Sequence, residues 1–114
     1  MGKFDDVVEK MKGEMTGKLG MKKVDATLLT AVAKSLGPSI YRKDASLVAC
    51  SDKKERENIK KKFLIKKLGL ADTEKLDAGI QAVCEEMGTR NRSKYRIIFY
   101  YLLTKKFKKT AVFK

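Results

Sequence analysis

Histidine and tryptophan are absent from this 114-residue chain, which contains only one proline and two cysteines. Without histidine the chain forms no histidine metal site, no Ser-His or Cys-His catalytic pair and no imidazole proton switch. No apolar run approaches the roughly 20 residues that a membrane-spanning helix needs. These absences exclude several common enzyme classes and predict a chain without a transmembrane segment.

Cys50 and Cys84 are enough for one disulfide, but the N-terminal residues contain no apolar signal segment. A chain without such a segment is expected in the cytoplasm, where thiols stay reduced. Cys84 also lies on the apolar side of an expected helix, which is typical of a small core residue. We therefore expect a cytoplasmic protein with reduced cysteines, and the sequence leaves open whether the two lie close together.

Paired carboxylates are another route to catalysis, but their spacing here is unsuitable. Glu85 and Glu86 are adjacent on an expected helix and point about 100° apart, so they cannot share a substrate as an acid and a base. Asp5 and Asp6 fail for the same reason. The glycines do not form a phosphate-binding loop of the P-loop type. The sequence predicts a protein that is not an enzyme and that has no metal site or cofactor.

Positive charge is in excess, with 27 lysines and arginines against 14 acidic residues and a net charge of +13. The first 50 residues hold 9 basic and 6 acidic residues, a net of +3, and residues 51–114 hold 18 and 8, a net of +10. Such a field favours anionic partners such as nucleic acid, acidic lipid or an acidic protein. It also serves solubility alone in many small proteins, and both interpretations stay open at this point.

Glycine-containing motifs divide the chain into segments whose apolar residues recur at spacings of three and four. Glycine ends helices readily because it adopts positive φ angles. The four glycines in these motifs are Gly20, Gly37, Gly69 and Gly88. Four ends imply five helices, at about residues 4–18, 25–36, 52–68, 73–87 and 90–108. Asp25 and Asp52 are the expected N-caps of the second and third helices.

Residues 95–103 form the longest nearly unbroken apolar run, and they organise the predicted fold. A strand is an alternative for nine residues rich in Ile, Phe and Tyr, but the chain offers no partner strand. A helix that is apolar on nearly all sides is buried centrally. We therefore predict an all-α fold, a compact bundle of about five helices with the C-terminal helix central, in a single domain over residues 1–114.

Two basic segments, the third helix and residues 90–109, predict binding of a nucleic-acid backbone or a phosphorylated ligand. Four cations at the start of the last helix oppose its dipole, and a bound anion would relieve their repulsion. The candidate anion-binding residues are Arg90, Arg92, Lys94, Arg96, Lys60, Lys61, Lys67, Lys105 and Lys108. This conjunction makes a small non-enzymatic binding module the favoured function.

Ile97 and Tyr101 lie on the more charged half of the last helix, and one hypothesis is that both are exposed. Tyr101 could then stack on a base, although a tyrosine in such a position more often packs at the edge of the core. The alternative function is protein–protein interaction, in which these two residues form a surface for a partner or a homodimer. A third possibility is peripheral attachment to anionic lipid, which needs an exposed apolar face beside the lysines.

Several segments resemble a small bacterial family of cytosolic proteins of unknown function. The similar segments are residues 37–41, 63–70, 91–96 and 99–103, and the likeness covers most of the chain. The resemblance implies a bacterial, cytoplasmic, compact domain. It brings no activity, cofactor or active site with it.

Overall fold

Five α-helices make up the fold in the computed structural model, which describes residues 2–18, 20–41, 47–88 and 94–113. They are α1 (Lys3–Gly13), α2 (Ala26–Leu36), α3 (Lys53–Asn58), α4 (Glu74–Met87) and α5 (Arg96–Lys106). Two π-helical segments, η1 (Glu14–Lys18) and η3 (Ile59–Ile65), continue α1 and α3, while η2 (Gly37–Tyr41) and η4 (Thr110–Phe113) are short 3-10 helices. The described residues contain no strand beyond one isolated bridge, so the all-α prediction is confirmed.

The four glycine motifs end helices as predicted. Gly20, Gly37, Gly69 and Gly88 all have positive φ angles, between 65° and 98°. Behind Gly69, the amide of Leu70 donates to the carbonyl of Leu64 at 3.1 Å, and Met21 donates to Met15 in the same way at 2.9 Å. A side chain at such a φ costs about 1 kcal/mol or more, which is why glycine occupies these positions.

The predicted N-caps are also confirmed. Asp25 accepts a hydrogen bond through its side chain from the amide of Leu28 at 3.1 Å, and Asp52 accepts one from Lys54 at 2.9 Å. Each bond satisfies an amide that lacks a partner inside the first turn of the helix. The starts of α2 and α3 therefore follow from local sequence.

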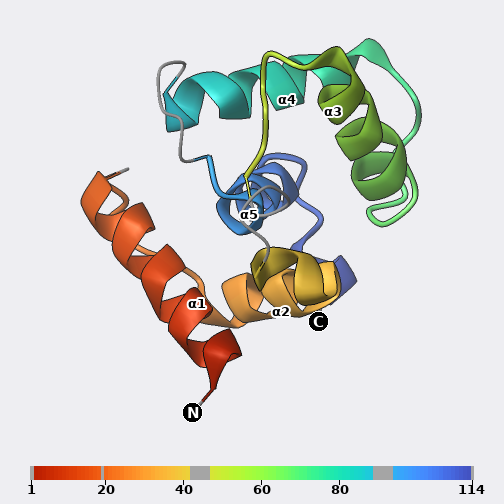
Figure 1. The fold of residues 1–114 in the computed structure, drawn as a ribbon. Coiled ribbons are helices and arrows are strands. Elements are labelled where there is room, and N and C mark those ends of the chain that lie inside the picture. Colours follow the sequence, from red (N-terminus) through yellow and green to blue (C-terminus); the bar gives the residue numbers. More distant parts are fainter. Residues whose placement is uncertain (1, 19, 42–46, 89–93, 114) are drawn as a thin grey trace.

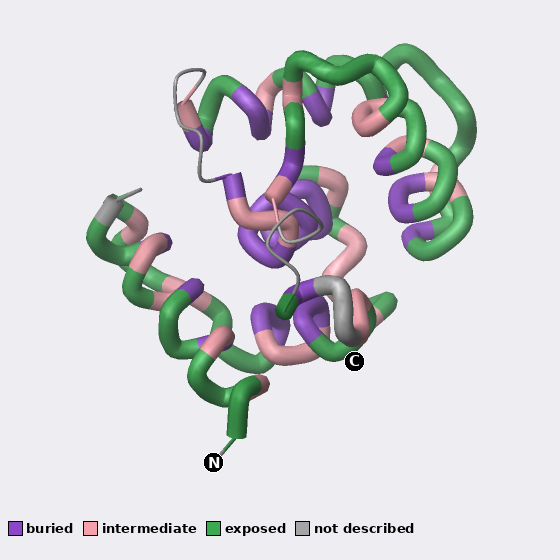
Figure 2. Tube along the Cα trace, viewed as in Figure 1, coloured by how far each residue is buried: buried purple, intermediate pink, exposed green. Residues whose placement is uncertain are grey.

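Helix α5 occupies the centre of the molecule, where it is seen nearly end-on between α2 below and α4 above (Figure 1). Every residue from Ile97 to Thr104 is buried, and the tube of α5 is correspondingly the most continuously buried part of the fold (Figure 2). Because α2 and α4 cover it from two sides, no half of α5 faces solvent over this stretch. The prediction of a central C-terminal helix is confirmed.

The start of α5 corrects the sequence prediction, which placed it near residue 90. Tyr95 is extended, with φ −63° and ψ 132°, and the helix begins at Arg96. The carbonyl of Lys94 accepts from the amide of Val48 at 2.8 Å, and Leu47 forms the isolated bridge with Tyr95. Pairing with the distant segment at residues 47–48 therefore holds residues 94–95 out of the helix. The predicted first turn at residues 89–93 lies outside the described residues.

The cysteines provide a second correction, because Cys50 and Cys84 are joined in a disulfide with their Cα atoms 6.1 Å apart. Cys84 lies in the last turns of α4 and is buried, as predicted, whereas Cys50 precedes α3. Their sequence separation is 34 residues, so they meet only through the tertiary fold. The presence or absence of a signal segment does not predict whether two distant cysteines meet in the fold.

None of the helices in the described part of the chain is long and apolar enough to cross a membrane.

Candidate anion-binding site

Arg96, one of the candidate anion ligands, is engaged inside the protein. Its guanidinium forms a 2.8 Å ion pair with Glu55 of α3 and donates to the hydroxyl of Tyr100 at 3.2 Å and to the carbonyl of Leu47 at 3.3 Å. Burial lowers the pKa of Arg96, but the bond to Glu55 and the interaction with Tyr100 outweigh burial and raise it overall. Arg96 thus connects α5 to α3 and to Leu47. Its guanidinium group is used in these contacts and has little capacity to bind an external anion.

Lys60 is likewise paired within the fold. Its ammonium group lies 3.0 Å from both Asp72 and Asp77, and hydrogen bonds to Asp77 and then Asp72 raise its pKa. Lys61 forms only an exposed ion pair with Glu57, four residues earlier, at 3.5 Å. Exposed pairs of this kind contribute little, so Lys61 is still available to an anion whereas Lys60 is not.

Burial removes three further residues from the predicted surface. Lys94 is 6% exposed, Ile97 3% and Tyr101 0%. The Tyr101 hydroxyl accepts from the amide of Asp25 at 2.8 Å, and the ammonium of Lys105 lies 5.8 Å from the centre of its ring. The hypothesis that Ile97 and Tyr101 are exposed was wrong, because helices cover both sides of α5. Neither residue is available for base stacking or for a protein interface.

Arg90 and Arg92, the remaining candidates of that group, lie outside the described residues. Lys94 precedes α5, so it does not lie in the first turn of the helix as predicted. Arg96 does lie in that turn, and its ion pair with Glu55 neutralises its charge.

At the other end of α5 the C-terminal segment folds back onto α2 and η3. The ring of Phe113 in η4 stacks near Phe63 of η3, with the ring centroids 6.3 Å apart, and Phe63 stacks on Tyr100 of α5 at 4.1 Å. The ammonium of Lys67 lies 5.3 Å from the centre of the Phe113 ring. The end of the third helix is therefore anchored against the C-terminal segment.

Two more contacts fix this segment. The ring of Phe107 packs on Gly79 of α4, where an added Cβ would overlap it. After α5, Lys108 takes a φ of 55° and the amide of Lys109 donates to the carbonyl of Thr104 at 3.0 Å, which is a Schellman-type end with lysine in the position usually taken by glycine. The backbone that carries the C-terminal lysines is thus held in place.

We call the lysines of this region the C-terminal basic edge. Its members are Lys66, Lys67, Lys105, Lys106, Lys108 and Lys109. Five are exposed and Lys109 is half-buried, and none forms an ion pair with another residue of the described part of the chain. Of the predicted ligands, Lys67, Lys105 and Lys108 belong to this set of lysines without a carboxylate partner among the described residues.

Comparison with known families places this arrangement in context. Residues 10–111 match the family described as a protein of unknown function (DUF2853). The chain belongs to the DUF2853 family. No curated protein matches it. The match supports the resemblance to an uncharacterised family that the sequence suggested.

Lys66, Lys106 and Lys109 of this DUF2853 protein were absent from the predicted set. Phe107 and Phe113 are the signal that could have found them, since two aromatic residues in a lysine-rich tail indicate that it packs on the core. Nothing local, however, specifies that Phe113 meets Phe63, fifty residues earlier in the chain.

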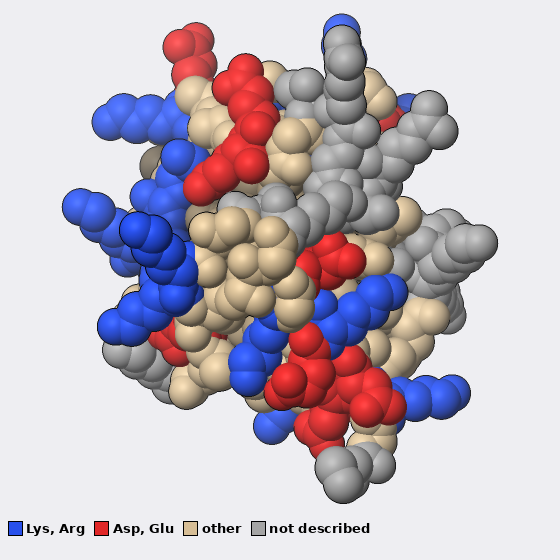
Figure 3. All heavy atoms as spheres, turned by 90° about the vertical axis from the view of Figure 1, so that its left-hand side faces the viewer, with Lys and Arg blue, Asp and Glu red and all other residues tan. Residues whose placement is uncertain are grey.

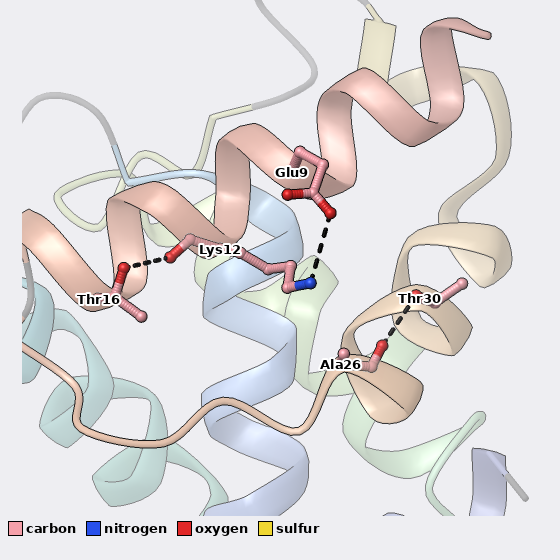
Figure 4. A network of polar contacts seen from close by, with 5 residues as sticks. All are labelled: Glu9, Lys12, Thr16, Ala26 and Thr30. Atoms are coloured by element: carbon pink, nitrogen blue, oxygen red, sulfur yellow. Dashed lines mark hydrogen bonds and ion pairs between the residues drawn. The ribbon is translucent and has the colours of Figure 1, made fainter. Parts of the chain in front are cut away.

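One face of the DUF2853 protein, on the α1 side, mixes both charges (Figure 3). On the face at the α1 side, acidic groups lie among the lysines and arginines, several of them near the lower end of the view (Figure 3). On α1, Lys12 bonds to Glu9 at 3.4 Å and the Thr16 hydroxyl to the Lys12 carbonyl at 3.0 Å, so these polar groups are satisfied within one helix (Figure 4). The described residues contain no group of acidic or cysteine side chains suited to a metal ion.

Proposed function

We propose that this DUF2853 protein is a non-enzymatic module that binds an anionic partner at the C-terminal basic edge. The supporting observation is the contrast between its lysines and the other predicted ligands. Lys60 and Arg96 have carboxylate partners in the fold, whereas the six edge lysines have none among the described residues. Ammonium groups without a carboxylate partner keep their full positive field, which attracts an anion more strongly than that of a paired cation.

The chemistry of the edge favours phosphate contacts without sequence reading. Lysine is a compact point charge that contacts phosphate from many directions, whereas arginine gives the bidentate geometry that recognises bases. All six members of the edge are lysines. The edge also has no exposed aromatic ring for base stacking, because Phe113 is half-buried between α2 and η3. A polyphosphate backbone therefore fits it better than a specific base sequence.

A salt-dependent titration tests this proposal, with a fluorescein-labelled DNA duplex of about 16 base pairs as the probe. If about four phosphates are neutralised, the logarithm of the affinity should fall with the logarithm of the salt concentration with a slope near −3.6. The variant with Lys66, Lys67, Lys106 and Lys109 changed to glutamine should lose most of that slope.

The matched control changes four exposed lysines elsewhere to glutamine, namely Lys22, Lys23, Lys53 and Lys75. It has the same net charge as the edge variant, so it separates a local site from the overall field. The proposal requires the control to keep most of the wild-type slope. Equal losses in both variants, or no binding by the wild type, would overturn it.

The alternative function, self-association through Ile97 and Tyr101, no longer has a surface because both residues are buried. The cytoplasmic, bacterial origin expected from the sequence stays a prediction. The disulfide argues against a reducing compartment, since such bonds are rare in the cytosol. Cell fractionation with an antibody against the protein tests the location.

A further inference from the structure

A cleft of about 650 Å³ lies between α1, η2 and the residues that lead into α5. Its volume is within the range of about 300–1,000 Å³ that is usual for small-molecule sites. Helix α1, which lines the cleft, lies on one side of α5, whereas α3 lies on the other side (Figure 1). The cleft is thus a different region from the C-terminal basic edge.

The floor of this cleft is aliphatic. Met11 of α1, Ile40 of η2 and Ile97 of α5 line it and are 2%, 7% and 3% exposed. Val7 and Leu47, both half-buried, also line it. When an apolar chain displaces water from a cleft with such a floor, the free energy falls and binding is favoured.

The rim carries positive charge on one face of α1. Lys3 and Lys10 are seven residues apart, which is about two helical turns, so both point to the same side. Asp6 lies between them, which leaves a net charge of +1 for the three side chains. Neither lysine forms an ion pair with another residue in the described ranges.

Two tyrosines complete the rim. The ammonium of Lys10 lies 5.0 Å from the centre of the Tyr95 ring, a cation–π contact that positions the charge at the mouth of the cleft. Tyr41 also lines the cleft and is 46% exposed. Both tyrosines line the cleft, whereas its aliphatic floor offers no hydrogen-bond donor.

We propose that the cleft binds a straight-chain monocarboxylate of the fatty-acid class. The carboxylate is placed at Lys10 and Lys3, and the alkyl chain lies on Met11, Ile40 and Ile97. A net charge of +1 at the rim matches a single negative charge. The floor matches an aliphatic chain because its residues are branched or flexible aliphatic side chains rather than aromatic ones.

Titration with sodium decanoate, below the concentration at which it forms micelles, tests this site. Tyrosine emission is a direct readout, since the chain has no tryptophan to mask it and Tyr95 and Tyr41 line the cleft. Each added methylene should tighten binding about fourfold, so decanoate should bind about 16-fold more tightly than octanoate. Decylamine, which has the same chain and the opposite charge, should not bind.

Two variants and a matched control locate the ligand. Lys10→Glu should weaken decanoate binding about tenfold or more, because it removes a charge-assisted hydrogen bond. Val7→Trp should weaken it by filling the cleft without a change of charge. Lys23→Glu has the same charge change as Lys10→Glu on an exposed residue outside the cleft and should bind decanoate as the wild type does.

The proposal is overturned if Lys10→Glu and Lys23→Glu bind decanoate equally, if decylamine binds as well as decanoate, or if the wild type binds neither acid. DNA binding by Lys10→Glu is measured beside these titrations. It should equal that of Lys23→Glu, since the two variants share one net charge and both leave the C-terminal basic edge intact. Failure at the cleft is therefore separable from failure at the edge.

Discussion

Reduction of the Cys50–Cys84 disulfide should destabilise the protein by a large fraction of its total stability. The bond closes a loop over a sequence separation of 34 residues. The entropy that such a loop removes from the unfolded chain corresponds to about 3.8 kcal/mol at 25 °C. Domains of this size unfold with a free energy of roughly 5–15 kcal/mol, so loss of the bond should leave a marginal fold. For a chain of 114 residues the expected fall in Tm is about 16 °C.

Urea unfolding followed by far-UV circular dichroism, with and without a reducing agent, measures this effect. The double variant Cys50→Ala, Cys84→Ala is the control, because a reducing agent can act on the wild type only through these two residues. The midpoint of the wild type should fall on reduction to near that of the variant, and the midpoint of the variant should not move. Thiol titration of the unreduced, unfolded wild type should find no free thiol. Two free thiols, or a wild-type midpoint that ignores the reducing agent, would refute the reasoning.

Three further predictions concern single positions, each measured by urea unfolding. Gly79→Ala should destabilise by about 1 kcal/mol, because overlap with the Phe107 ring outweighs the gain in helix propensity, whereas Gly13→Ala, with open space around it, should stabilise by about 0.5–1 kcal/mol. Stabilisation by Gly79→Ala would contradict the packing of Phe107. Lys108→Gly should stabilise by about 1 kcal/mol by relieving the positive φ, while Lys108→Ala should have no such effect, and equal changes in the two would rule out strain there. Burial raises the pKa of Tyr100 above 10.0 in the folded state. The protonated hydroxyl therefore contributes to the stability of the fold below pH 10. This contribution is lost as the pH rises through the pKa that Tyr100 has in the folded state. The difference in stability between wild type and Tyr100→Phe should therefore shrink from about pH 8 to about pH 11, and a constant difference would contradict this assignment.

The positions of helix ends could be predicted because their causes are local. Gly20, Gly37, Gly69 and Gly88 end helices through their own φ angles, and Asp25 and Asp52 cap helices through amides two or three residues away. Interactions of this range are written in consecutive residues. The central place of α5 was predictable for a related reason, since a helix that is apolar all round has no face to give to water.

The candidate site could be predicted only in part, because the state of a lysine or arginine depends on residues far along the chain. Lys60 is paired with Asp72 and Asp77, and Arg96 with Glu55, over separations of 12 to 41 residues. No pattern in the sequence distinguishes these two cations from Lys67, which has no carboxylate partner within the described part of the chain.

The sequence by itself determined the helix boundaries that end in glycine or begin at aspartate, the excess of positive charge and the central burial of the last helix. Tertiary structure decided that Tyr101 is buried with its hydroxyl on the amide of Asp25, that α5 starts at Arg96, and that Cys50 meets Cys84. The reason is the range of the forces involved. A φ angle or a cap is settled within four residues, whereas a buried hydroxyl, an ion pair or a disulfide needs two segments that meet only when the core has formed.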